Sequence, residues 1–525
     1  MKTKVVIVSC YGYMQPPNAE PLSAEILHSS LLSKFTPEEI DCYHEVLDYR
    51  IDPMGYLLAD KLSVSDIKPD VLGISIPQST YDLSISFLDA FFLKNPNTLI
   101  VLGHALPTHS PDIFLQKYSN ALIVRGWGEE TFCEIIAGVR SKKLNLSKIP
   151  NLMYFENEIK KNIVKWPTTY TKPIRYQPNG YFARIESSRG CHYDVCTFCT
   201  RQPKALKNIS WFRYPVQEVL EEIRHIKSLG ISSFTFTDED FIGNDLSGAE
   251  ELANGLTEIS DIKFSLSVRV DNIINLSESE EMNNRRFSLL KLLKAGGLSL
   301  VYLGVESLSD TQLRRYGKGV TASESIKALN IVRDLEIPAE FGYILFDPFL
   351  TFDELEENIS WLAKSNFWMD VGQLFNNLRV QKDTAFVKHL QNKNLLGKYD
   401  PNTMDYEYEF ETPIIGKMAS YCIQWKEEID EVYSLARNVQ RTKLSESPSD
   451  KFIYNYRLLE FNILKEFVKI ADGNGSISFD NDLKNRRTEL VIDLKQSLEN
   501  MNLLESEVNL LKAINSYMMK WVNKN

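Results

Sequence analysis

The sequence has no long hydrophobic run and no excess of basic residues. No apolar stretch in its 525 residues approaches the about 18–20 residues that cross a membrane. A net charge of −11 argues against broad attraction to nucleic acid or to anionic membranes. The apolar stretch in "MKTKVVIVSC" is too short for a signal peptide and predicts a first core strand. We therefore expect a cytoplasmic protein without nucleic-acid or membrane partners.

Cysteine is scarce, and its count is odd. Seven cysteines in a long chain indicate reduced thiols, whereas a disulfide framework requires many cysteines in a short secreted chain. The length exceeds what one hydrophobic core can serve, so several domains are expected.

The first 140 residues lack the G-x-G-x-x-G signature of dinucleotide binding after their first strand. What they have is an alternation of apolar strands and helical segments, which predicts an α/β domain with a doubly wound parallel sheet. Ligands of such sheets bind at the carboxyl ends of the strands. The residues that we expect there are Ser75, Gly103, Gly126 and Glu129. The strands are predicted at 4–10, 43–49, 70–79, 99–107 and 121–130.

A second alternation follows a connector, predicted at 141–180, that is rich in Lys, Pro and Asn. Residues 181–395 predict a partial β/α (TIM-like) barrel, whose functional groups are expected after the carboxyl ends of its strands. Residues 396–525 predict a mainly helical C-terminal region. The barrel strands are predicted at 182–188, 232–238, 264–270, 299–307, 338–346 and 371–380.

Three cysteines, Cys191, Cys196 and Cys199, stand in a C-x4-C-x2-C pattern just after the first of these barrel strands. A structural zinc site needs four closed ligands, and no second C-x2-C pair exists to complete one. An iron–sulfur cluster is normally held by four cysteines, so three leave one iron open for a substrate or cofactor. This pattern favours a catalytic four-iron cluster. Zinc with His192 or a distant fourth ligand, and chance clustering, stay open as alternatives.

The segment "IESSRGCHYDVCTFC" resembles the opening loop of the radical S-adenosylmethionine (SAM) superfamily. The resemblance implies a four-iron four-sulfur cluster whose open iron chelates SAM, and reductive cleavage of SAM to a 5′-deoxyadenosyl radical. It also implies an external electron donor of the flavodoxin or ferredoxin type. Phe198 matches the aromatic residue that lies against the SAM adenine. The usual spacing is C-x3-C-x2-C, so this chain has one extra residue between Cys191 and Cys196.

The resemblance continues along the predicted barrel. "FTDEDFIGN" resembles the acidic second-strand segment, which implies that Asp238 or Glu239 receives the SAM amino group. "LSVRVD" places Arg269 at the end of the third strand. "YLGVESLSDTQLRRYGKGVT" resembles the fourth-strand segment, which implies a SAM contact for Glu306 and a structural or carboxylate-binding role for Lys318.

The N-terminal segments "PDVLGISI", "LIVLGHALPTHSPDIF" and "VRGWGEETF" resemble the cobalamin-binding-type domain that precedes many radical SAM barrels. The four strand-end residues named above would then lie against cobalamin. The chain lacks the D-x-H-x-x-G histidine and has Arg50 there, and His104 and Trp127 are bulky where the family is small. Cobalamin binding and a domain that only buttresses the barrel are both open.

The leading hypothesis is a radical SAM enzyme that abstracts hydrogen from an unactivated carbon of a peptide or small natural product, with methyl transfer if cobalamin is bound. The alternatives are a radical epimerase, dehydratase or rearrangement enzyme, and, in a different class, a non-catalytic metal-stabilised binding protein. Cys422 is the one cysteine in the C-terminal region. It is interpreted either as a hydrogen donor to a substrate radical or as a buried helix residue.

Overall fold

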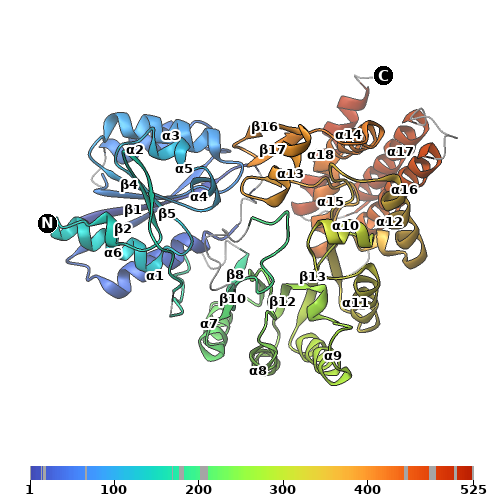
Figure 1. The fold of residues 1–525 in the computed structure, drawn as a ribbon, viewed down its shortest axis with the longest axis horizontal. Coiled ribbons are helices and arrows are strands. Elements are labelled where there is room, and N and C mark those ends of the chain that lie inside the picture. Colours follow the sequence, from blue (N-terminus) through green and yellow to red (C-terminus); the bar gives the residue numbers. More distant parts are fainter. Residues whose placement is uncertain are drawn as a thin grey trace.

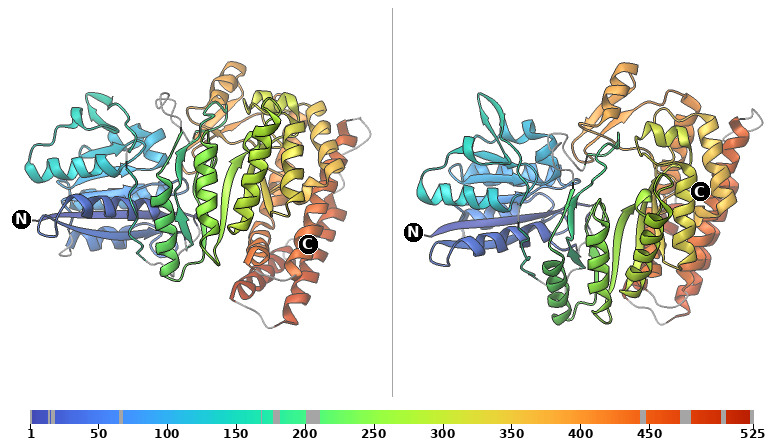
Figure 2. Two further views of the ribbon diagram at one scale, coloured as in Figure 1. Left: turned by 90° about the horizontal axis from the view of Figure 1, so that it is seen from below. Right: turned by 60° about the horizontal axis from the view of Figure 1, so that its bottom comes forward.

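The molecule consists of an N-terminal α/β domain, a central open barrel and a C-terminal helical region, arranged side by side (Figure 1). The three parts follow one another along the chain, and the barrel lies between the other two in the views of Figure 2. The computed structural model describes residues 2–13, 15, 19–64, 68–167, 169–176, 182–200, 211–442, 447–471, 480–501 and 505–522.

The N-terminal domain is built on a seven-stranded sheet with the order β2-β1-β3-β4-β5-β6-β7, in which the first five strands are parallel. Both faces of the sheet are buried under helices, since the two sides of β1 belong to two separate hydrophobic cores. This confirms the predicted doubly wound sheet. The strands are β1 Thr3–Tyr11, β2 Ile40–Asp48, β3 Val71–Ser75, β4 Leu99–Gly103, β5 Ala121–Val124, β6 Leu152–Glu156 and β7 Glu158–Lys161. The helices are α1 Leu22–Lys34, α2 Tyr56–Val64, α3 Tyr81–Lys94, α4 Ala105–His109, α5 Pro111–Leu115 and α6 Glu129–Ser141.

The segment expected to be a plain connector carries the last two strands of that sheet. β6 pairs antiparallel with β5, and β7 turns back on β6 through Asn157, whose φ is 61°. Asparagine adopts this left-handed conformation more readily than most residues, which suits a tight hairpin. Residues 152–161 therefore extend the N-terminal sheet.

The barrel sheet is parallel, with five strands in the order β14-β13-β12-β11-β8. Apolar residues alternate along its strands and pack against the outer helices, so that the intervening polar residues face the lumen. The strands are β8 Ala183–Ile185, β11 Ser233–Phe236, β12 Lys263–Arg269, β13 Leu298–Glu306 and β14 Ala339–Tyr343. The helices around them are α7 Val216–Ser228, α8 Leu246–Thr257, α9 Glu280–Ala295, α10 Asp310–Arg315, α11 Ala322–Asp334 and α12 Phe352–Ser365.

The prediction of a sixth regular strand at 371–380 was wrong. This segment touches β14 and the residues after it through isolated bridges, Phe341 with Val371 and Phe346 with Asn377. The carbonyl of Asn376 accepts hydrogen bonds from the N–H groups of both Leu345 and Phe346, at 3.1 Å each. Two N–H groups thus share one carbonyl where a strand would have a regular ladder of hydrogen bonds. Because this segment forms no sixth strand, the barrel stays open.

The C-terminal region combines a small antiparallel sheet with a helical layer against the barrel. The sheet touches the N-terminal domain: Met404 is buried in one of that domain's cores, and the carbonyl of Asn402 accepts from the N–H of Ser79 at 2.7 Å. The sheet consists of β15 Val380–Gln381, β17 Asp405–Tyr408 and β16 Leu396–Asp400. The helices are α13 Ala385–Lys393, α14 Pro413–Glu427, α15 Asp430–Thr442, α16 Pro448–Ala471, α17 Asp480–Glu499 and α18 Glu505–Val522.

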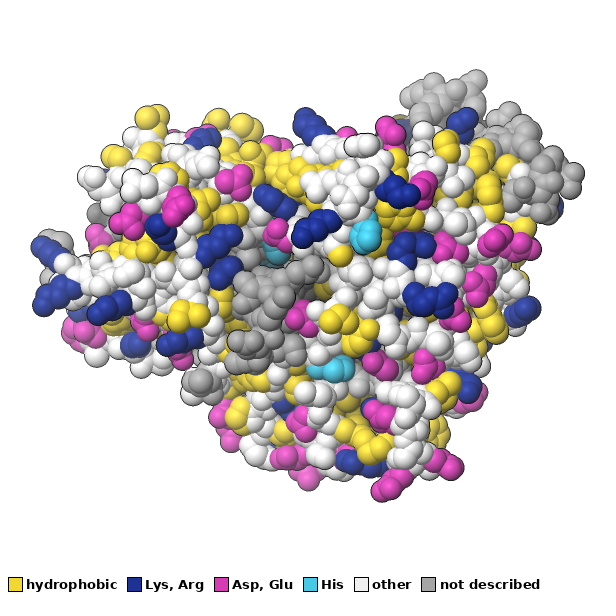
Figure 3. Space-filling view, viewed as in Figure 1, with side chains coloured by type: hydrophobic (Ala, Val, Ile, Leu, Met, Phe, Trp, Pro, Cys, Tyr) yellow, Lys and Arg dark blue, Asp and Glu magenta, His cyan; other side chains and the backbone are white. Residues whose placement is uncertain are grey.

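Acidic and basic side chains are interspersed over the face of the molecule seen in Figure 3. None of the helices in the described part of the chain is both long and apolar enough to cross a membrane.

Candidate active site at the cysteine loop and the adjoining cavity

The three cysteines follow a short ribbon at the carboxyl end of the first barrel strand. After β8 the chain forms β9, Ser188–Gly190, which pairs antiparallel with β10, Trp211–Arg213. Cys191 comes directly after β9. At this end of the barrel Cys191 and Cys196 are half-buried and Cys199 is exposed. This is the face on which barrel proteins carry their chemistry.

The part of the loop between Cys196 and Cys199 is docked on the turn that follows α10. The N–H of Thr197 donates to the carbonyl of Tyr316 at 2.9 Å, and its hydroxyl donates to the carbonyl of Arg315 at 2.8 Å. Gly317 has a φ of 61°, and a Cβ there would lie 3.0 Å from the carbonyl oxygen of Val195. The turn therefore has glycine where the cysteine loop approaches most closely.

The loop fits an iron–sulfur cluster better than a single metal ion. Among the described residues no three Cys, His, Asp or Glu side chains converge on one point that a metal ion could occupy. A cluster does not need that convergence, because each cysteine binds a different iron. Nη1 of Arg269 lies 4.0 Å from Sγ of Cys196, which places a positive charge beside the thiols. Burial raises the pKa of Cys191, and the charge of Arg269 opposes this rise and favours the thiolate that binds metal.

Asp238 lies behind the cysteine loop, and its contact with SAM stays a prediction. It is 4% exposed and accepts from the N–H and hydroxyl of Ser187, at 3.1 and 2.7 Å, and from the hydroxyl of Ser188. Burial raises the pKa of Asp238 to about 6, although these hydrogen bonds counteract the rise. Asp238 thus holds the ribbon that leads into Cys191.

The other predicted SAM-binding residues are placed at the barrel mouth. Glu306 forms an ion pair with Lys318, 3.1 Å between Oε1 and Nζ, and both are largely buried. Although burial alone would lower the pKa of Lys318, the Glu306 carboxylate keeps that pKa above its usual value. Arg269 ends β12 beside Cys196. Phe198 packs edge-on against Tyr316, with 5.6 Å between the ring centroids. Their contacts with SAM remain predictions.

A cavity of about 380 Å³ separates the N-terminal sheet from the ribbon that carries the cysteines. Such volumes are typical of small-molecule sites. Its walls include the four predicted strand-end residues, Ser75, Gly103, Gly126 and Glu129, together with Glu239 from the barrel. A Cβ on Gly103 would meet nothing within 4 Å, which shows how open the space beside β4 is. The strand-end rule thus placed its four residues around one cavity.

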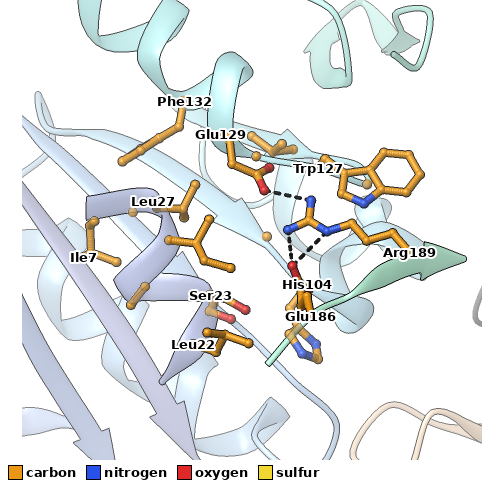
Figure 4. Close-up of a pocket in the computed structure, with 18 of the residues that line it drawn as sticks. Ile7, Leu22, Ser23, Leu27, His104, Trp127, Glu129, Phe132, Glu186 and Arg189 are labelled. Carbon is orange, nitrogen blue, oxygen red and sulfur yellow. Dashed lines mark hydrogen bonds and ion pairs between the residues drawn. The ribbon is translucent and has the colours of Figure 1, made fainter. Parts of the chain in front are cut away.

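Arg189 bridges the two domains across this cavity (Figure 4). Its guanidinium pairs with Glu129 of the N-terminal domain, 2.7 Å from Nη1 to Oε1, and with Glu186 of the barrel, 2.6 Å from Nη2 to Oε2. Sequence reasoning missed this role, because nothing in the local pattern tells which carboxylate of another domain an arginine meets.

His104 and Trp127 are the bulky residues that the sequence placed at this cavity. The backbone conformation at His104 and an aromatic contact of Trp127 fit both side chains into its wall. His104 has a φ of 77°, a conformation that glycine usually takes, and its Nδ1 accepts from the N–H of Ala105. Trp127 stacks on Trp166, with 3.8 Å between the ring centroids. Both still line the cavity, which remains open. Arg50 folds back on Asp48 through two 2.7 Å hydrogen bonds and does not line the cavity.

Cys422 lies in α14 and is 0% exposed, packed in the core between the barrel and the C-terminal helices. Burial raises the pKa of its thiol well above the usual value. This position supports the interpretation of Cys422 as a buried helix residue, because a hydrogen donor must touch the substrate.

Comparison with known proteins identifies the central domain. Residues 185–362 match the sequence model of the radical SAM superfamily. The central barrel is thus a radical SAM domain. The match confirms the prediction of a radical SAM enzyme with a four-iron four-sulfur cluster and SAM as cofactors. The cysteine loop described above is the part of the chain that fits the cluster.

Two curated relatives show how far the likeness extends. The chain is 28% identical over 385 residues to 4′-phospho-dehydrooxetanocin synthase of Priestia megaterium. The matched region is 67% of this chain and 51% of the synthase. The chain is also 28% identical over 333 residues to an uncharacterized methyltransferase of Pyrococcus horikoshii, covering 58% of this chain and 68% of the relative. The chain therefore spans about half the length of the synthase.

Solved structures share the three-part architecture. The fold matches that of the cobalamin-dependent SAM radical enzyme OxsB, determined with aqua-cobalamin and SAM bound, with a TM-score of 0.78 and 22% identity over 99% of this chain and 79% of OxsB. The radical SAM methyltransferase TsrM from Kitasatospora setae matches with a TM-score of 0.61 and 14% identity, over 79% of this chain and 88% of TsrM. These likenesses confirm the predicted fold class.

Proposed function

We propose that this protein is a cobalamin-dependent radical SAM enzyme that transfers a methyl group to an unactivated carbon of a peptide or small natural product. The observation that supports this most directly is the cavity between the carboxyl edge of the N-terminal sheet and the ribbon of the cysteine loop. A cofactor held there borders the radical site. The structurally similar OxsB and the relatives named as methyltransferases support the same assignment.

The size and lining of the cavity suit the nucleotide tail of a cobalamin, which the lining residues would hold. Its walls combine apolar side chains from β1, β3, β4 and α1 with glycines at 103, 126 and 128. Glycines let a planar group approach the backbone closely. Glu129, Glu186 and Arg189 supply the polar groups along the rim that faces the barrel.

The chain's own residues divide the remaining tasks. Cys191, Cys196 and Cys199 would hold the cluster, which supplies the electron for cleavage of SAM when both cofactors are bound. The ion pair of Glu306 and Lys318 offers a carboxylate and an ammonium group at the mouth of the barrel for the polar groups of SAM. The barrel lumen would receive the substrate.

One anaerobic experiment tests the proposal. The protein is reconstituted with iron and sulfide, given SAM and a reductant, and assayed for 5′-deoxyadenosine; binding of hydroxocobalamin is followed by its absorbance. We expect both signals, with Gly103→Trp abolishing cobalamin binding and preserving the iron content, because the indole would fill the cavity. Leu93 on α3 is 82% exposed and does not line the cavity, so Leu93→Trp provides the matched control. A loaded cluster without 5′-deoxyadenosine would refute radical chemistry, and a wild-type protein that binds no cobalamin would refute methyl transfer.

A second candidate follows if the cavity holds no cobalamin. The same cluster loop and SAM would then serve a radical epimerase, dehydratase or rearrangement enzyme. The partner for electrons would be a flavodoxin or ferredoxin in either case.

A further inference from the structure

The four residues between Cys191 and Cys196 form a loop that is fixed on both sides. His192 Nδ1 lies 2.7 Å from Oδ2 of Asp240, which is fully buried. The other carboxylate oxygen of Asp240 accepts from Nδ2 of Asn272 at 2.8 Å. The beginning of the loop is therefore tied to the barrel through a buried carboxylate, with no contribution from the cysteines.

Tyr193 fixes the other side of the loop on the end of β12. The guanidinium carbon of Arg269 lies 3.8 Å from the centroid of the Tyr193 ring, which is a close cation–π contact. Arg269 is 4% exposed, and it donates two hydrogen bonds to Asp271, at 2.9 and 3.0 Å, and one to the carbonyl of Lys318 at 3.0 Å. The Tyr193 ring contributes a further contact that fixes where the guanidinium lies.

Gly319 supplies the space that the Tyr193 ring occupies. The φ of Gly319 is 72°, and a Cβ there would lie 2.7 Å from Cζ of Tyr193. Gly319 thus faces the hydroxyl end of the ring, and the guanidinium of Arg269 lies close to the ring centroid. The same guanidinium approaches Sγ of Cys196, 4.0 Å from its Nη1. Tyr193 and the cysteine sulfur are two of the groups that surround one buried cation.

We propose that Tyr193 is a positioning residue that holds the Arg269 guanidinium against Cys196, and that this contact raises the reduction potential of the cluster and slows its loss. A positive N–H donor beside a ligand sulfur stabilises the more negative, reduced cluster. This inference rests on the proposed function only in requiring that the loop holds a cluster. It assigns a task to one of the four residues between Cys191 and Cys196, where the loop is one residue longer than is usual in the superfamily.

The test compares Tyr193→Leu, which removes the aromatic face, with the matched control Tyr193→Phe, which keeps it. Each reconstituted protein is analysed anaerobically for iron content, for the electron paramagnetic resonance spectrum of the reduced cluster, for midpoint potential, and for the rate of iron loss to a chelator. We expect Tyr193→Leu to shift the potential to a more negative value, alter the spectrum and lose iron roughly tenfold faster, as is common when a group behind a metal ligand is removed. Tyr193→Phe should match the wild type.

Arg269→Lys provides a second route, because lysine keeps the charge but lacks the planar group that stacks on the ring and reaches the sulfur. It should shift the potential in the same direction as Tyr193→Leu, so the inference stays testable if Tyr193→Leu fails to fold. Unchanged potential, spectrum and iron loss in the folded variants of a cluster-bearing protein would overturn the inference. A wild-type protein that assembles no cluster would overturn the proposed function instead.

Discussion

The junction between the N-terminal domain and the barrel contains three buried carboxylates around one arginine. Arg175 lies between Glu20, Glu25 and Glu222, and the side chains of all four are at most 3% exposed. Glu20 and Glu222 approach Arg175 to 2.6 and 2.7 Å, whereas Glu25 stays 3.8 Å away. One cation cannot compensate three buried negative charges. Burial first, and then the neighbouring Glu20, raise the pKa of Glu25 to about 7.

The raised pKa makes stability depend on pH in a defined direction. In the unfolded chain Glu25 titrates near 4.5, so between pH 4.5 and 7 the native state binds more protons than the unfolded state. The stability that this group contributes is complete below pH 4.5 and is lost as the pH rises through 7. The full shift corresponds to roughly 3 kcal/mol.

Glu25→Gln removes this titration and keeps the oxygen that accepts from the N–H of Tyr176 at 2.8 Å. We take the unfolding free energy of Glu25→Gln minus that of the wild type, and expect this difference to rise by up to roughly 3 kcal/mol from pH 5 to pH 8. Any constant cost of the amide cancels when the two pH values are compared. Urea titrations followed by tryptophan fluorescence measure the unfolding free energies.

The control is Glu221→Gln on the solvent side of α7, where the carboxylate is exposed. This variant controls for the loss of one carboxylate outside the cluster around Arg175. A Glu25→Gln variant whose stability difference is constant from pH 5 to pH 8, or grows at low pH, would show that Glu25 is ionised in the native protein and would refute the reasoning.

Three further predictions concern the site. Arg189→Met should lower the unfolding free energy by about 3 kcal/mol in urea titrations, because it leaves two carboxylates facing each other across the cavity, and Glu129→Gln in the same chain should restore part of the loss. Asp238→Asn weakens the hydrogen bonds that Ser187 and Ser188 donate to this side chain. Calorimetry should therefore show a lower melting temperature, and the reconstituted protein should lose iron from its cluster faster than the wild type. Cys422→Ala should lower the unfolding free energy by about 1–2 kcal/mol and leave the yield of 5′-deoxyadenosine unchanged. A change in the reaction product would instead support the interpretation of Cys422 as a hydrogen donor.

The alternation of side chains along the barrel strands explains why Asp238 and Glu239 face different surroundings. In "FTFTDED" the residues Phe234 and Phe236 pack toward the helices, and Asp238 has the same parity, so it points away from the lumen. Glu239 has the opposite parity and lines the cavity. Resemblance treated the two carboxylates as equivalent, whereas the period of two could have separated them.

Contacts between distant parts of the chain were beyond sequence reasoning. Ser75, Gly103, Gly126 and Glu129, which the strand-end rule selected, line one cavity, because topology alone sets that edge of a parallel sheet. The partner of Glu129 comes from another domain and depends on how the two domains pack. The prediction of a strand at 371–380 was wrong for a related reason. The apolar pattern of this segment indicates burial, but its hydrogen bonds follow the bend at the mouth of the barrel.

The cavity and the radical site are joined by a single short strand. In β9, Arg189 and Gly190 line the cavity, and Cys191 follows immediately. Behind this strand Asp238 holds the two serines that precede Arg189. A molecule that fills the cavity therefore lies against the strand that carries the first cysteine. Ser187, Ser188 and Arg189 are therefore all anchored: the two serines donate to Asp238, and Arg189 pairs with Glu129 and Glu186. Movement of these three residues would shift the first cysteine relative to the cavity.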